Sequence, residues 1–300
     1  VEANESALVG AGTLTNAAGH TIRGQGTINV ANVANQSTIQ AAGGVLTIDS
    51  AVTNTGGGTL SIAADGILNL SNSTATGGSL VGIDGGQLQN GTLANLSVSG
   101  VVKQSSSATR LSDTITNSGV LTFLGNNSNN VNGFDDVYQI DSTATVTGSG
   151  KLVLVELNES ALTGSGTLFN TGGHSIEGTG TIAVNVNNAG GVVKLTAGNL
   201  IALSNATITG GEVNGSPTGL LSGSGGTLDG VTITGTVRRD SGATILAGTI
   251  TNSGTLTFLG NNSNNVNGFD DVYQINGATT LTGSGSLTMV EANESALVGA

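Results

Sequence analysis

Short runs in which apolar residues alternate with small polar residues recur along the whole chain. They lie at residues 46–48, 60–62, 93–98, 181–184 and 231–233. A period of two residues is typical of strands that bury one face. No stretch has the sustained i, i+3, i+4 spacing of a helix. The pattern therefore predicts an all-β protein with short strands and essentially no α-helix.

Glycine and asparagine punctuate these runs at short, regular intervals. Gly-Thr-Leu or Gly-Thr-Ile recurs along the chain, and Thr-Asn-x-Gly occurs at residues 53–56, 116–119 and 251–254. Both glycine and asparagine tolerate the positive φ of tight corners. A chain that turns every few residues and stacks coil on coil is a parallel β-helix, with about 4.8 Å between neighbouring strands. We expect right-handed coiling, from the general bias of parallel β connections.

Long repeats divide the chain into units. The sequence VEANESALVGA stands at residues 1–11 and again at 290–300, and a diverged copy begins at Val155. Residues 124–140 and 259–275 contain the same block, LGNNSNNVNGFDDVYQI. We therefore assign a first unit to 1–154, a second to 155–289 and the start of a third to 290–300, all in one continuous solenoid.

The first unit carries about 21 extra residues between positions 31 and 68, while the flanking segments stay aligned. A solenoid tolerates the loss of a whole coil because each coil contacts only its neighbours. The extra segment thus indicates a coil of about 20 residues and, over the chain, about 14 or 15 coils. Leu124 and Leu256 are expected to point into the core of their coils.

Composition supports a thin, repeated core. The chain has 50 glycines in 300 residues, 2% aromatic residues, 9% charged residues and no cysteine. Its mean hydropathy of +0.17 argues against a charge-expanded disordered chain. The net charge of −12 makes nucleic acid an improbable partner. No apolar run approaches the roughly 18 residues that a membrane span needs.

Several segments carry a family resemblance. The stretches GTLTNAAGHTIRGQGTI, TLDGVTITGTV and TLTGSGSL resemble the Gly/Asn/Thr-rich β-helical repeats of large bacterial exoproteins of the autotransporter-passenger and filamentous-haemagglutinin type. The resemblance covers nearly the whole chain. It implies a right-handed β-helix, secretion, and extracellular display on the cell surface as an adhesin, stalk or fibre. It brings no catalytic residues with it.

The repeated Asn/Asp block is the candidate site. One hypothesis is calcium binding, because carboxylates and amide carbonyls supply the oxygens that Ca²⁺ prefers; its ligands would be Asn132, Asp135, Asp136, Asn267, Asp270 and Asp271. A second interpretation is a loop that bulges from one coil, with its aromatic residues covering the core. A third is lateral contact with another molecule, because aromatic residues are favoured at interfaces; this would use Phe134, Tyr138, Phe269 and Tyr273.

The remaining polar residues favour structural roles. His20 and His174 occupy equivalent positions and are expected to be turn histidines, since no further metal ligand is near them in sequence. Basic residues are sparse, and nothing resembles a nucleophile with its base. We therefore expect no enzyme and no cofactor other than Ca²⁺, although many β-helices act on polysaccharides. The expected function is a structural filament whose partner is itself, through neighbouring units or end-to-end and lateral assembly. The alternative is an adhesin that binds glycan or protein.

Overall fold

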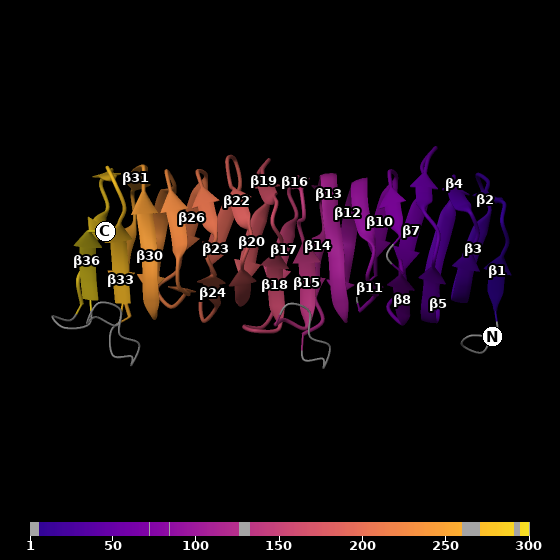
Figure 1. The fold of residues 1–300 in the computed structure, drawn as a ribbon, viewed down its shortest axis with the longest axis horizontal. Coiled ribbons are helices and arrows are strands. Elements are labelled where there is room, and N and C mark those ends of the chain that lie inside the picture. Colours follow the sequence, from indigo (N-terminus) through magenta and orange to yellow (C-terminus); the bar gives the residue numbers. More distant parts are fainter. Residues whose placement is uncertain are drawn as a thin grey trace.

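The structure is a computed structural model that describes residues 6–71, 73–83, 85–125, 133–259, 271–290 and 295–299. The described residues contain no helix, and 63% of them lie in strands. They therefore provide no long apolar helix that could cross a membrane. The strands lie side by side along a rod, with the two termini at opposite ends (Figure 1).

Most strands are short, as the alternating runs predict, although β5, β12 and β13 run for 11, 13 and 11 residues. The first twelve are β1 (Ala7–Val9), β2 (Thr13–Asn16), β3 (Thr21–Asn29), β4 (Asn32–Asn35), β5 (Thr38–Ile48), β6 (Val52–Asn54), β7 (Thr59–Ile62), β8 (Gly66–Asn69), β9 (Thr74–Thr76), β10 (Ser79–Gly82), β11 (Gln87–Gln89) and β12 (Thr92–Gln104). The next twelve are β13 (Ser107–Asn117), β14 (Val120–Phe123), β15 (Asp136–Gln139), β16 (Thr143–Thr147), β17 (Lys151–Leu154), β18 (Ser160–Thr163), β19 (Thr167–Asn170), β20 (Ser175–Gly178), β21 (Gly180–Ile182), β22 (Asn185–Asn187), β23 (Val192–Leu195) and β24 (Leu200–Leu203). The last twelve are β25 (Thr207–Thr209), β26 (Glu212–Gly215), β27 (Leu220–Ser222), β28 (Gly226–Asp229), β29 (Thr232–Arg239), β30 (Gly242–Ala247), β31 (Thr249–Asn252), β32 (Thr255–Phe258), β33 (Asp271–Ile275), β34 (Thr280–Thr282), β35 (Ser286–Leu287) and β36 (Ser295–Gly299).

Every strand pairs in parallel with the equivalent strand of the neighbouring turn. Leu80, for example, lies in register with Leu60 of the turn before and with Val98 of the turn after. The result is a β-solenoid of about 13 turns with roughly 20 residues in each, which confirms the predicted fold class. The right-handed sense of coiling stays a prediction.

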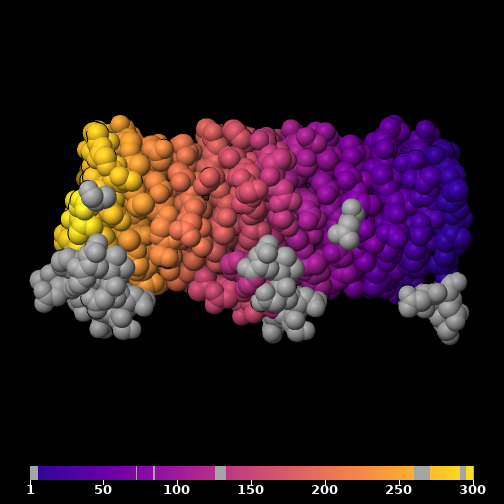
Figure 2. All heavy atoms as spheres, viewed as in Figure 1, coloured from indigo at the N-terminus to yellow at the C-terminus, as the bar shows by residue number. Residues whose placement is uncertain are grey.

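The turns are fewer than the 14 or 15 expected because two of them are longer than the rest. Val120 pairs with Lys151, and Thr255 pairs with Ser286, so each of these turns takes 31 residues. Both contain the repeated Asn/Asp block. The ladder also crosses residue 154 without a break, since β15, β16 and β17 pair with β18, β19 and β20. On the face shown in Figure 2, the described turns form one uninterrupted rod.

The core is one contiguous column of stacked aliphatic side chains that runs from Ile28 to Tyr273. Leu256 is fully buried in it, as predicted. Leu124 is 41% exposed, so its expected place in the core is wrong. The reason is that β14 ends at Phe123, whose ring takes the inward position, and the chain leaves the ladder immediately afterwards.

A column of three glycines lies at one corner of each unit. Gly100 has a φ of +69° and pairs with Gly82, and a Cβ on Gly100 would lie 2.0 Å from the carbonyl oxygen of Gly82. Gly119 approaches the oxygen of Gly100 in the same way. The second unit repeats the column at Gly215, Gly235 and Gly254. Glycine is therefore required here by the close approach of successive backbones.

Candidate functional site

The two Asn/Asp blocks lie where β14 leads to β15 and where β32 leads to β33. Of the predicted site residues, Asn132, Asn267, Phe269 and Asp270 lie outside the described residues. The structure places Phe134, Asp135, Asp136, Tyr138, Asp271 and Tyr273.

Asp136 is fully buried and accepts two backbone hydrogen bonds. Its Oδ1 accepts from the backbone N–H of Ser106 at 2.7 Å, and its Oδ2 accepts from that of Gly125 at 2.8 Å. In the second unit, Oδ1 of Asp271 accepts from the N–H of Ser241 at 2.6 Å, as Oδ1 of Asp136 accepts from that of Ser106. The backbones of Ser106, Gly125 and Ser241 all have positive φ. Asp136 therefore binds two sharp turns, at Ser106 and Gly125, and Asp271 binds the turn at Ser241.

Asp135 lies against a neighbouring carboxyl group. A hydrogen bond with the side chain of Asp135 raises the pKa of Glu159, and desolvation and the charges of Asp135, Glu156 and Asp136 raise it further. The backbone carbonyl of Glu159 also accepts from the N–H groups of Asp135 and Asp136, at 3.1 and 2.8 Å. The hydrogen bond and the nearby negative charges favour the protonated form of Glu159.

The described carboxylates of the block do not form a calcium site by themselves. In the part of the chain that the structure describes, no three His, Cys, Asp or Glu side chains are grouped so that they could hold a metal ion. Both oxygens of Asp136 accept hydrogen bonds from backbone N–H groups. The calcium hypothesis therefore stays a prediction that depends on Asn132, Asn267 and Asp270.

The two tyrosines of the block are core residues. Tyr138 packs edge to face on Phe123 with ring centroids 5.0 Å apart, and Tyr273 packs on Phe258 at 5.1 Å. Both tyrosines are 0% exposed. Their predicted role in lateral contact is therefore wrong, because an interface residue must reach the surface. Phe134 is half-buried.

Burial leaves the tyrosine hydroxyls without a hydrogen-bond partner among the described residues. It also raises the pKa of Tyr138 and of Tyr273 well above the ordinary value for tyrosine. The rings thus lie in the core of the long turns, as the interpretation of a bulging loop with aromatic residues over the core proposes.

Asparagine side chains form ladders along a corner of the solenoid. The side-chain amide of Asn16 donates to Oδ1 of Asn35 at 2.8 Å, and that of Asn35 donates to Oδ1 of Asn54 at 2.7 Å. In the second unit, Asn170 donates to Asn188 at 2.7 Å. These bonds satisfy buried amides and tie each turn to the next.

His174 joins the asparagine ladder where the two sequence units meet. Its Nδ1 lies 2.6 Å from Oδ1 of Asn170, and its Nε2 lies 3.0 Å from Nδ2 of Asn117. Burial lowers the pKa of His174 to about 4. The ring is therefore neutral, donates from Nδ1 and accepts at Nε2. His174 thus serves as a turn histidine, as predicted; His20, in the first turn, makes the same contact with Asn16 at 2.8 Å.

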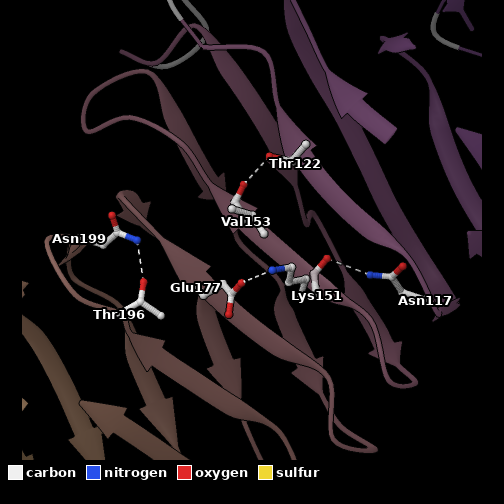
Figure 3. Close-up of polar contacts among 7 residues, drawn as sticks. All are labelled: Asn117, Thr122, Lys151, Val153, Glu177, Thr196 and Asn199. Carbon is white, nitrogen blue, oxygen red and sulfur yellow. Dashed lines mark hydrogen bonds and ion pairs between the residues drawn. The ribbon is translucent and has the colours of Figure 1, made fainter. Parts of the chain in front are cut away.

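Charged side chains follow one outer face between the units. Nζ of Lys151 lies 2.6 Å from Oε1 of Glu177 (Figure 3). Glu177 is in register with Lys194 of the next turn. Figure 3 also shows Asn117 donating to the carbonyl of Lys151. A partly exposed ion pair of this kind contributes at most about 1 kcal/mol.

Arg239 is a structural residue that the sequence analysis counted among the sparse basic residues. It is 0% exposed, and its guanidinium donates to the carbonyls of Leu221, Gly223 and Ser241. Burial lowers its pKa to about 10. The alternation along β29 could have revealed it, because Val237 and Arg239 lie on the same inward face.

No family model matches the chain, and no curated protein matches it.

Proposed function

We propose that this chain is a structural segment of a long, secreted bacterial repeat protein that forms an extracellular filament or stalk. The observation that carries the proposal is the continuity of the parallel ladder across the sequence units. Strands β15 to β17 pair in parallel with β18 to β20, as strands within a unit pair with each other. A protein built by repeating such units grows in length without a new interface.

The internal chemistry supports the same proposal. Among the described residues of the Asn/Asp blocks, Asp136 and Asp271 accept backbone hydrogen bonds and Tyr138 and Tyr273 fill the core. Asn ladders, glycine columns and a single aliphatic core recur from turn to turn. Such a rod resists bending because every turn bonds to its neighbours through several parallel strands.

Electron microscopy of native material from the cell surface tests this proposal. A filament or stalk is expected to show a 4.8 Å axial spacing between turns. It is also expected to show a longer period that corresponds to the 289-residue repeat. Globular particles with neither period would contradict the proposal.

A second candidate is an adhesin that binds glycan through a lateral face. A row of hydroxyl side chains in register along one face favours it, consisting of Thr21, Thr38, Thr59, Ser79, Ser97, Thr116 and Thr147. Successive hydroxyls about 4.8 Å apart could accept and donate hydrogen bonds to a polysaccharide chain. Binding of labelled glycans to the wild-type chain, lost when Thr38, Thr59 and Ser79 are changed to alanine, would favour the adhesin.

A further inference from the structure

The two sequence units differ in length at one corner of the solenoid. In the first unit, two residues join Leu88, which faces the core, to Gly91. In the second unit, the four residues 222–225 join Leu221, which also faces the core, to Gly226. The corners are equivalent because β11 pairs with the end of β12 and β27 pairs with the end of β29. The corner of the second unit is therefore two residues longer.

A side chain fills this corner in the first unit. Nδ2 of Asn90 donates to Oδ1 of Asn69 at 3.0 Å, and Oδ1 of Asn90 accepts from the hydroxyl of Ser107 at 2.7 Å. Asn69 belongs to the turn before and Ser107 to the turn after. Asn90 thus closes the corner across three successive turns.

The same corner is hollow in the second unit. Gly242 occupies the position of Ser107, and the residues 222–225 alternate serine and glycine. A cavity of about 220 Å³, which we call the serine hollow, is lined by Ser222, Gly223, Ser224, Ser241 and Gly242. The longer corner therefore leaves space where the first unit has packed side chains.

Close backbone contacts keep glycine at two positions around the serine hollow. A Cβ on Gly242 would lie 2.8 Å from the carbonyl oxygen of Gly223. A Cβ on Gly225 would lie 2.3 Å from Oδ1 of Asn205. Both distances are too short for an ordinary contact, so a side chain at either position would require its neighbour to move. These two positions therefore do not supply a side chain that closes the space.

Serines from two successive turns line the serine hollow. Oγ of Ser222 and Oγ of Ser241 lie 3.4 Å apart, and Ser224 is exposed. A serine hydroxyl has one hydrogen to donate and two lone pairs that accept. The three side chains can therefore offer both donors and acceptors to a ligand that is itself rich in hydroxyl groups.

The charges beside the serine hollow favour an uncharged ligand. Nη2 of Arg239 donates to the carbonyls of Gly223 and Ser241, and the whole side chain is 0% exposed. The negative charges of Asp240 and Asp271 also act on the guanidinium. The positive charge is therefore compensated within the fold, as buried charges usually are, and it does not attract an anion.

We propose that the serine hollow binds one ring of a neutral sugar through Ser222, Ser224 and Ser241. Its volume of about 220 Å³ is below the roughly 300 Å³ of a small drug-sized pocket, so it takes a single ring and not an oligosaccharide. The site goes beyond the proposed filament, because a structural rod needs no ligand. It is also separate from the hydroxyl row that runs from Thr21 to Thr147.

Saturation-transfer difference NMR of the full 300-residue chain tests the site, with the methyl glycosides of glucose, galactose and mannose as probes. At least one sugar is expected to give a signal with the wild type. Ser222→Ala/Ser224→Ala/Ser241→Ala should reduce that signal about tenfold, because it removes the hydroxyl partners. Ser142→Ala/Ser149→Ala, at exposed positions elsewhere, should keep it. No signal from any of the three sugars, or equal signals from the two variants, would overturn the site.

A second variant closes the serine hollow without removing a turn. Residues 222–225 are replaced by the Gln-Asn of the first unit, and Gly242→Ser restores the partner that Asn90 has there. Since the first unit contains this corner, the variant is expected to fold, and an unchanged melting temperature checks that it does. The sugar signal should be lost. A closed corner that still gives the wild-type signal would contradict the proposal.

Three further outcomes separate this site from its alternatives. The methyl glucuronide should bind more weakly than the methyl glucoside, and the opposite preference would overturn the assignment to neutral sugars. A signal lost in Thr38→Ala/Thr59→Ala/Ser79→Ala but kept in the serine variant would place the sugar on the hydroxyl row instead. Filaments on cells together with no sugar binding would leave the filament standing and overturn the serine hollow alone.

Discussion

Nδ2 of Asn117 lies 3.0 Å from Nε2 of His174, and this buried contact joins the first sequence unit to the second. The amide donates to a neutral imidazole, whose other nitrogen donates to Asn170. The contact links the asparagine ladders of the two units. It also places a titratable group where only its uncharged form can accept the bond.

Acid should weaken the rod through His174. Its pKa is about 4 in the folded chain and about 6.5 when unfolded, so the unfolded chain binds the proton first as the pH falls. The contribution is fully present above pH 6.5 and is lost as the pH falls towards 4, by up to ~3 kcal/mol. Denaturant unfolding at a series of pH values measures the loss.

The two histidines provide a matched pair for this measurement. His174→Gln should flatten the dependence of the free energy of unfolding on pH between 6.5 and 4. His20→Gln, at the exposed equivalent position, should leave that dependence as in the wild type. An unchanged slope in His174→Gln would show that His174 is not the titrating group.

Asp136→Ala should destabilise the long turn with or without calcium. The substitution removes the acceptor of two backbone N–H groups, which should cost about 3 kcal/mol. Thermal unfolding in excess calcium and in a chelator is expected to give the same loss.

Asp141→Ala is the control, since the side chain of Asp141 is 47% exposed and its ion pair with Arg110 contributes little. A loss in Asp136→Ala that appears only in calcium would instead identify Asp136 as a metal ligand.

Tyr138→Phe and Tyr273→Phe should keep or raise stability. Each removes a buried hydroxyl that has no hydrogen-bond partner among the described residues, and it keeps the edge-to-face ring contact. The gain is expected to reach about 1 kcal/mol. Tyr138→Ala should instead cost about 4 kcal/mol, because it leaves a large cavity.

Chemical denaturation of the three tyrosine variants separates these outcomes. A loss of more than about 1 kcal/mol in Tyr138→Phe would mean that the hydroxyl has a partner after all.

Much of the fold could be predicted from the sequence because the alternation of apolar and polar residues indicates two things at once. It shows where a strand lies and which of its side chains point into the core. The runs at 60–62 and 93–98 fall within β7 and β12, with Leu60 and Leu93 facing inward. Glycine and asparagine mark corners because backbone geometry permits few alternatives there. The parallel stacking followed from the extra coil, whose length matches the 19- to 21-residue register of the neighbouring turns.

The candidate site was less predictable because composition does not say which way a side chain points. Tyr138 follows Asp135 and Asp136 in an Asn-rich block, a setting that suits a surface loop as well as the start of a strand. Its burial is decided by the ladder with Leu162, which lies 24 residues further on. Arg239 was missed for a related reason, because a basic residue is ordinarily expected to lie in solvent. Only the alternation of inward and outward positions along β29, continued to its last residue, places Arg239 on the inward face.

Leu256 and Leu124 show how sharply the inward face is defined, and they give a last prediction. Leu256→Asp buries a carboxylate in a core position that is 0% exposed, so the surrounding turns should unfold while distant turns stay folded. Leu124→Asp changes a side chain that is 41% exposed and should leave the rod intact. Limited proteolysis followed by mass spectrometry should find new cleavage sites near residue 256 only. Equal resistance of both variants to the protease would mean that Leu256 does not support its turn. Cleavage along the whole rod would mean that the turns unfold as one cooperative unit.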